Sequence, residues 1–318
     1  MTKRYCSDPR IVGVRRRTTL ASWLVIGQGV GMSLGPFAGG LFYKIGFGGR
    51  GGLVWNGFTA PAWAMAGVWA LFWAVVWWYY EDIPSEQRAF EVVAEPLTGI
   101  AFQAATVAQS SNSQPSLFRL TVQQRGVILC MCWFAMTCFF ILGAWESNIP
   151  VFGASTPPFH WSPFAAGNFL ALGGVTTFPF LIVNLLLAGR MQDRLILALG
   201  TTLGLFGLVT FLGLLGAGRK ALNYGAVFVC WWAVALGFNL ASTVTMSTLS
   251  KMLPPKWNGR TSLAIQYSNY TGRVAGAVWG GSGVAIGMLN YIGLQIGLVG
   301  VGAALSMTLW RNLKTKMG

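Results

Sequence analysis

The chain has 318 residues, of which 54% are hydrophobic and only 9% carry a charge, whereas soluble domains are usually about 25% charged, so the composition excludes an ordinary soluble protein. The net charge of +14 would suggest nucleic acid as a partner of a soluble chain, but a membrane protein gathers basic residues on the loops at one face of the bilayer. We therefore expect an integral membrane protein that is embedded in lipid and has no nucleic-acid partner.

Long apolar runs divide the chain into eight expected transmembrane helices. A helix needs about 20 apolar residues to cross the hydrocarbon core of a bilayer. Tryptophans near the ends of these runs, including Trp145 and Trp161, are expected to anchor in the headgroup layer. We expect an all-α, multi-pass fold with spans at about residues 19–42, 62–80, 126–149, 164–188, 195–217, 224–246, 262–286 and 290–310.

The basic residues predict how these spans are oriented. Cytoplasmic segments of membrane proteins carry an excess of Lys and Arg. If the N-terminus lies inside, nearly all basic residues fall on inner segments, and Arg273 falls within a span. The outer segments then hold only Lys44, Arg50, Arg219 and Lys220. We therefore expect both termini in the cytoplasm.

Two of the expected spans carry the same glycine pattern. Glycines recur every four residues in both, each run ends in a double glycine, and an Arg-Thr pair precedes each run at a similar distance. We interpret the two spans as copies of one helix. The repeated residues are Gly31, Gly35, Gly39 and Gly40 in the first span, and Gly272, Gly276, Gly280 and Gly281 in the seventh.

Glycines at this spacing have two interpretations. They let helix backbones approach closely in lipid, where packing replaces the hydrophobic effect. Alternatively, the first copy is a moving seal of a transport pathway, because Pro36 removes a backbone hydrogen bond and bends the helix. The sequence leaves both interpretations open.

A polar stretch at residues 81–124 separates two spans from the other six. It is acidic at first and then rich in Gln and Ser, which is typical of a flexible connector. We expect a remnant of an N-terminal bundle at residues 1–80, a cytoplasmic connector at 81–124 and a six-helix bundle at 125–318. Because spans one and seven are copies, the period is six helices, and the pattern predicts that four helices of a twelve-helix protein are absent upstream.

Arg273 is the one basic residue that the spans place inside the membrane. It lies about 20 Å of helix beyond Arg260, and an arginine at that depth is costly and marks a functional site by default. Helical spacing puts Gln266, Asn269 and Tyr270 on the same face. We expect these four residues to bind an anionic substrate or to couple its movement. The alternative is a structural charge paired with carbonyl groups or with a carboxylate on another helix.

Glu146 is the one carboxylate expected within a span, near the outer end of the third. A carboxylate in the membrane can take up and release a proton during a transport cycle, so Glu146 is a candidate for proton coupling. The alternative is a solvated glutamate at the outer interface, because Glu146 lies about 30 Å of helix beyond Arg125.

Several kinds of chemistry have no support in the sequence. There is no G-x4-G-K-S/T loop, which argues against an ATP-driven pump. An intramembrane hydrolase would need paired Asp or a Ser and His arrangement, and the expected spans hold neither Asp nor His. His160 lies in a short outer loop with no nearby set of metal ligands. We therefore expect no enzyme activity, no cofactor and no metal site.

The chain resembles the major facilitator superfamily. Its first span is similar to that family's antiporter glycine motif, G-x8-G-x3-G-P-x2-G-G, with Ser22 in place of the first glycine. The loop at residues 189–194 is similar to the family's G-x3-D-R inner-loop motif, which implies that Asp193 and Arg194 form ion pairs and helix-end contacts that gate the cytoplasmic side. The resemblance implies a partial major-facilitator fold. The motif positions matched in the first span are Gly31, Gly35, Pro36, Gly39 and Gly40.

A narrower resemblance is to the branch that contains lysosomal facilitators and vacuolar phosphate transporters with SPX domains. It rests on the Arg-Arg-Thr lead-in to the first span, the Pro61-Ala62-Trp63 entry to the second, and the Gly272-Arg273 pair. No SPX domain is present in the sequence. This resemblance implies an anionic substrate.

We expect a carrier that moves a small solute by alternating access and is coupled to protons or another ion. Arg273 and the resemblance favour an inorganic anion. The membrane is either vacuolar or lysosomal, or the plasma membrane, and the oligomeric state is left open. The competing hypothesis is a non-transporting membrane fragment or scaffold from an incomplete gene, because eight spans cannot build two pseudosymmetric six-helix halves.

Overall fold

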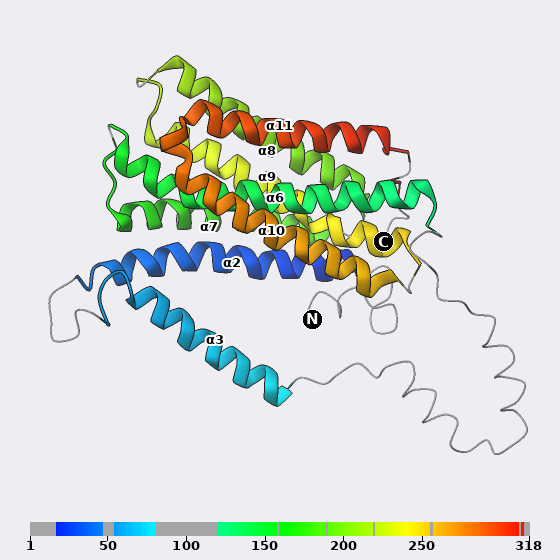
Figure 1. The fold of residues 1–318 in the computed structure, drawn as a ribbon, viewed down its shortest axis with the longest axis horizontal. Coiled ribbons are helices and arrows are strands. Elements are labelled where there is room, and N and C mark those ends of the chain that lie inside the picture. The colour runs from blue at the N-terminus through cyan, green and yellow to red at the C-terminus, as the bar shows by residue number, and fades with distance from the viewer. Residues whose placement is uncertain are drawn as a thin grey trace, which may run out of the picture. The chain divides into compact units, whose positions relative to one another are not determined.

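The structure is a computed structural model that describes residues 17–46, 54–79, 120–157, 159–187, 190–218, 220–254, 257–311 and 313–314. Within these residues the regular structure consists of eight helices, so the expected all-α fold is confirmed (Figure 1). The basic segment before Arg17, most of the connector and Gly189 lie outside the described residues. The helices are α2 (Arg17–Tyr43), α3 (Ala60–Tyr79), α6 (Val122–Ser155), α7 (Pro163–Leu187), α8 (Asp193–Ala217), α9 (Tyr224–Met252), α10 (Asn258–Ile286) and α11 (Met288–Thr308).

Each of these helices coincides with one expected span, and several are longer than the span. α6 has 34 residues and α9 has 29, because helical sequence continues beyond the apolar run. Seven of the eight helices in the described part of the chain are long and apolar enough to cross a membrane. α10 is the eighth, and polar residues such as Gln266, Asn269 and Arg273 lower its hydropathy.

The chain forms two compact units, which we describe separately. One comprises residues 1–58 and 122–318, and therefore contains α2 and the six helices from α6 to α11. The other comprises residues 59–121 and contains α3. Within the larger unit, α2 packs along α7.

α9 is the central helix of the larger unit. It packs against α8, α6, α7 and α2, and nearly all its side chains between residues 230 and 250 are buried. Hydroxyl groups in its second half bond to carbonyl groups of the same helix: the Oγ of Ser242 donates to Asn239 O at 2.8 Å, and the Oγ1 of Thr245 donates to Ser242 O at 2.9 Å. These bonds satisfy the hydroxyl groups internally, so a polar segment can pass through an apolar bundle.

α2 contacts α7 through small residues on both helices. A Cβ added at Gly40 would lie 3.1 Å from the backbone of α7. A Cβ at Gly167 would overlap the carbonyl oxygen of Pro36, and one at Gly174 would overlap the hydroxyl of Ser33. The backbones approach this closely only because these positions carry no side chain.

The other repeated glycines of α2 lie on a different face of the helix. Among the described residues, no neighbouring atom lies within 4 Å of a Cβ built at Gly31, Gly35 or Gly39. The close approach expected from their spacing is therefore not made in this structure. The packing face of α2 is instead the face that carries Pro36 and Gly40.

The smaller unit contains α3, whose 20 residues are just sufficient to cross a bilayer. The helix is apolar on all sides, which is typical of a transmembrane span. Its aromatic rings contact one another along the helix, with centroids 5.7 Å apart for Trp69 and Phe72 and 6.3 Å apart for Trp73 and Trp77.

Candidate functional site

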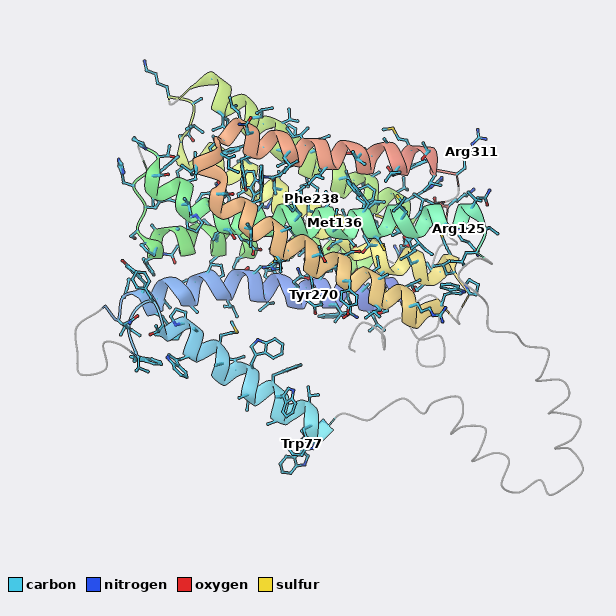
Figure 2. The ribbon with its side chains drawn as sticks, viewed as in Figure 1. Trp77, Arg125, Met136, Phe238, Tyr270 and Arg311 are labelled. Carbon is cyan, nitrogen blue, oxygen red and sulfur yellow. The ribbon has the colours of Figure 1, made fainter. Side chains whose placement is uncertain are left out.

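The glycines of α10 bring its backbone into contact with the backbone of α6. Contact with α6 buries Gly272, Gly276 and Gly280, and a Cβ at any of these positions would overlap a carbonyl oxygen of α6. Taken in chain order, these three glycines face the carbonyls of Met136, Phe140 and Ala144, respectively. Figure 2 labels Met136. The same order on both helices means that α6 and α10 run in the same direction.

Groups on α6 fix the position of α10 from the other side of this contact. A Cβ at Gly143 would lie 2.9 Å from the carbonyl oxygen of Arg273. The Nδ2 of Asn148, which is buried, donates a hydrogen bond of 3.0 Å to the carbonyl of Gly280. The backbone of Arg273 is thus held close to α6, within reach of the side chains one turn further along that helix.

Arg273 and Glu146 form an ion pair between α10 and α6. The Nη2 of Arg273 lies 2.5 Å from the Oε2 of Glu146, and the side chains are 38% and 18% exposed. The contact uses one atom of each group. The Nη1 of Arg273 and the Oε1 of Glu146 are both buried, and neither has a hydrogen-bond partner in the described part of the chain. The sequence suggested a role for each of these two residues separately, and the structure brings them together. The contact also matches the alternative interpretation of Arg273, in which its charge is paired with a carboxylate on another helix.

The other three residues predicted to share a face with Arg273 lie in different surroundings. Asn269 is buried, and its Oδ1 has no partner among the described residues. Gln266 is half-buried, and its Nε2 lies 3.5 Å from the hydroxyl of Ser262. Tyr270 is 67% exposed on the far side of α10 (Figure 2). No hydrogen bond between any two of these four side chains is present in the structure.

Asp193 makes a second ion pair at the opposite end of the unit from the α6–α7 connection. Its two carboxylate oxygens each lie 3.0 Å from the Nζ of Lys251, and the two side chains are 0% and 5% exposed. The hydroxyls of Ser247 and Thr248 donate to the Oδ2 of Asp193 at 3.1 and 3.4 Å. Asp193 begins α8, whose dipole favours a negative charge there. The pair joins the start of α8 to the end of α9.

Arg194 contacts a different neighbour. Its Nε donates to the Oε1 of Gln192 at 2.8 Å, and its Nη1 donates to the carbonyl of Trp310 at 3.2 Å. The guanidinium also lies 5.0 Å from the centre of the Trp310 ring. The two motif residues therefore connect α8 to the ends of two other helices, α9 and α11.

The sequence analysis missed three partners of Asp193, namely Lys251, Ser247 and Thr248. The expected span ended at residue 246, so these positions were assigned to a loop, whereas α9 continues to Met252. Three hydroxyl residues and a lysine at helical spacing after a span were the signal that could have extended it.

Trp145 lies in the interior and not in a headgroup layer as expected. It is 2% exposed, its Nε1 donates to the Oε1 of Gln295 at 2.9 Å, and its ring stacks on that of Trp231 with centroids 6.0 Å apart. The sequence showed that Trp145 lies near the end of a span, but it did not show that this face of the helix points into the bundle.

The described residues contain no group of three or more His, Cys, Asp or Glu side chains that could hold a metal ion. The cysteines there are unpaired, and Cys130, Cys138 and Cys230 are buried. The polar groups of the site are therefore the two ion pairs, the amides of α10 and the hydroxyls of α9.

Comparison with known proteins identifies the family. The family model of the Major Facilitator Superfamily matches residues 9–277. The chain belongs to the Major Facilitator Superfamily. Its relatives include two uncharacterized MFS-type transporters of Schizosaccharomyces pombe, each 24% identical, over 314 and 315 residues. These matches cover 99% of this chain and 59% and 64% of the two relatives.

An uncharacterized protein of the same yeast is 25% identical over 317 residues, which are 99% of this chain and 60% of that relative. The chain thus spans less than two thirds of the length of the curated relatives it matches. As a member of this family with seven helices long and apolar enough to cross a membrane among its described residues, it is a multi-pass membrane protein.

Proposed function

We propose that this Major Facilitator protein is a secondary carrier of a small anion, that protons drive it, and that it works by alternating access. The observation that supports this most directly is the Arg273–Glu146 ion pair, which joins a cation and a carboxylate between two transmembrane helices. Charged side chains inside a membrane are costly and are kept where a transport cycle uses them.

Arg273 binds the anion in this proposal. A guanidinium binds the oxygens of phosphate or carboxylate in pairs, through two parallel N–H donors. Its ion pair with Glu146 uses Nη2, whereas the buried Nη1 has no partner in the described part of the chain. An anion with two oxygens would satisfy both nitrogens, which favours it over the single contact with Glu146. Asn269, Gln266 and Tyr270 contribute further polar groups on the same helix.

Glu146 couples the anion to a proton. Protonation removes the negative charge that holds Arg273, so a proton on Glu146 and an anion on Arg273 bind together, which predicts symport. The other charges on the helices packed against α6 lie elsewhere: α7 and α11 contain no charged residue, Lys251 of α9 is paired with Asp193, and Arg260 of α10 lies about 20 Å of helix before Arg273. The other titratable groups on these helices are the cysteine thiols, three tyrosines of α10 and α9, and the buried phenol of Tyr291.

The helix-end contacts of Asp193 and Arg194 are the proposed gate on the cytoplasmic side. They tie α8 to α9 and α11 at one end of the unit. The distribution of basic residues favours a cytoplasmic location for this end and for both termini. The glycine helices α2 and α10 are the proposed moving seals, since backbones in direct contact slide without clashes between side chains.

Transport is a property that we assign to a longer protein. The matched relatives exceed this chain by more than a third of their own length. We propose that α6 to α11 form one complete half of the carrier, and that α2 and α3 belong to the other half. The narrower resemblance to vacuolar phosphate transporters supports phosphate as the first anion to test.

Uptake of inorganic phosphate into proteoliposomes, with the acidic side outside, tests the proposal. We expect Arg273→Ala to reduce uptake about tenfold or more, because a hydrogen bond to a charged group contributes about 1.5–3 kcal/mol. Glu146→Gln should retain phosphate binding and lose the response to the proton gradient. Tyr267→Phe, an exposed position on the same helix, is the matched control and should transport normally.

Two results would contradict the proposal. Equal uptake by the native protein and Arg273→Ala for phosphate, sulfate and nitrate would remove the anion-binding role. A native protein that takes up none of these anions at any pH would favour the competing hypothesis of a non-transporting scaffold.

A further inference from the structure

The connection between α6 and α7 lies at one end of the larger unit (Figure 1). Nine aromatic rings form a connected cluster that includes this connection. Neighbouring rings in the cluster have centroids between 4.7 and 6.2 Å apart. Aromatic pairs prefer offset-stacked or edge-to-face arrangements at such distances. The cluster draws on four helices and their connection. Its members are Trp145, Phe152, Phe159, Trp161, Phe169, Phe211, Tyr224, Phe228 and Trp231.

Two of these rings come from the connection itself, at residues 159–162, which we call the lid. The backbone N–H of Trp161 donates to the carbonyl of Gly153, in the last turn of α6, at 2.9 Å. A Cβ at Gly153 would overlap the ring of Trp161, so the ring sits where only a glycine permits it. Beyond it, the Trp161 ring contacts Phe169 of α7 at 4.7 Å and Tyr224 of α9 at 5.8 Å. The lid therefore bridges three helices.

His160 adopts a backbone conformation that its side chain disfavours. Its φ is 43°, and it is the one residue other than glycine with a positive φ in the described part of the chain. This left-handed conformation is sparsely populated for residues with a Cβ, and it persists where surrounding contacts enforce it. In the lid these contacts are those of Phe159 and Trp161, the two rings on either side. His160 itself is exposed, so the strain is stored in the backbone of the lid.

The aromatic cluster also contains, on α9, a buried polar group that has no partner among the described residues. Trp231 is 2% exposed, and its indole N–H has no hydrogen-bond partner among the described residues. The ring stacks on Trp145, which precedes Glu146 on α6. Burying an unpaired donor is unfavourable. A Cβ at Gly173 would overlap the indole nitrogen, so this N–H faces α7, and the cost that opening of the lid would relieve is the strain at His160.

We propose that residues 159–162 are an aromatic lid that closes this end of the bundle and opens locally, by rotation of the backbone at His160, while the helices stay in place. The ring contacts hold the lid shut, and the conformation at His160 acts against them. Because the strain at His160 offsets part of the stabilisation from the ring contacts, the free energy of opening is small enough for thermal motion to populate the open state. The lid would control entry at this end independently of the tilting of helices in the proposed transport cycle.

Native cysteines report on the lid without further engineering. Cys230 lies on α9 between the cluster residues Phe228 and Trp231 and is 1% exposed, whereas Cys130 lies on α6 toward the opposite end and is 0% exposed. The rate of alkylation of each thiol by N-ethylmaleimide can be followed in the purified protein by peptide mass spectrometry. A buried thiol reacts through the open state, so its rate follows the population of that state.

Three variants should open the lid and one should not. Trp161→Ala removes a ring, Gly153→Ala displaces it, and His160→Val keeps every ring but cannot easily hold a positive φ. We expect each to raise alkylation of Cys230 about tenfold or more, with Cys130 unchanged. His160→Gly adopts a positive φ readily and should react at or below the native rate.

The comparison of His160→Val with His160→Gly decides the proposal even where a ring deletion unfolds the protein. Equal Cys230 rates in these two variants would overturn it, because the backbone conformation at His160 would then have no part in opening. Equal increases at Cys230 and Cys130 would overturn it as well, because residues 159–162 would then support the whole bundle and not cover one end.

Discussion

Asp193→Asn is expected to lower the free energy of unfolding by about 3–5 kcal/mol, because it breaks a buried ion pair by removing one partner. The carboxylate is 0% exposed and bonds to Lys251 through both oxygens. Its removal takes away the carboxylate that lies 3.0 Å from the ammonium of Lys251, which is itself only 5% exposed. The hydroxyls of Ser247 and Thr248 then face a neutral amide in place of the charged carboxylate to which both donate. Thermal unfolding in detergent, followed by circular dichroism, measures the loss.

The double substitution Asp193→Leu with Lys251→Met separates the energy of the ion pair itself from the cost of burying the charge of Lys251 after its partner is removed. Replacing both members of a buried pair with apolar residues is often neutral, whereas removing one is not. We expect the double variant to recover most of the stability lost by Asp193→Asn. Arg194→Gln is the neighbouring control and should cost no more than about 1 kcal/mol, because its contacts with Trp310 are largely exposed. A loss in Asp193→Asn no larger than that of Arg194→Gln would contradict the prediction.

The helices could be predicted from the sequence, because the bilayer sets their length. Each apolar run of about 20 residues became one helix. The ends of the runs were less informative, since hydropathy marks where lipid ends and not where helical hydrogen bonding ends. α9 shows the consequence: its last turn, which carries Lys251, lies beyond the apolar run and supplies the partner of Asp193.

The contact between Arg273 and Glu146 could not be predicted. The residues are 127 positions apart, and spacing along one helix says which residues share a face but not which helix lies opposite. The individual costs of burying them could be predicted, because every charge in a membrane needs a partner or a function. The structure shows that these two charges are partners in one ion pair.

The glycine repeat illustrates the same limit. Its two copies have the same spacing, yet the glycines of α10 contact the backbone of α6, whereas a Cβ built at Gly31, Gly35 or Gly39 of α2 would meet no neighbouring atom of the described residues within 4 Å. A row of small residues indicates that another helix can pack closely on that face. Which helix does so depends on segments far away in the sequence. The pattern therefore predicts a face where close packing is possible, but not that a contact is made.

This difference between the copies leads to a matched pair of substitutions, Gly276→Ala and Gly35→Ala. At Gly276 the new methyl group would overlap the carbonyl of Phe140, a backbone atom that cannot turn away. Overpacking of this kind costs about 1–3 kcal/mol and occasionally more. We expect Gly276→Ala to destabilise the protein by at least this amount in thermal unfolding. It should also weaken proton-coupled uptake, because pushing α10 away from α6 moves Arg273 out of reach of Glu146.

Gly35→Ala adds the same methyl group at the aligned position of α2, where no neighbouring atom among the described residues lies within 4 Å. Alanine is a better helix former than glycine by about 1 kcal/mol, so this variant should be as stable as the native protein or more stable. The two variants share their chemistry, their place in the repeat and their change in helix propensity. Any difference between them therefore measures the contact with α6. If both lose the same stability, the glycines of α10 act through the helix itself, and direct contact between the backbones of α6 and α10 does not hold the Arg273–Glu146 pair together.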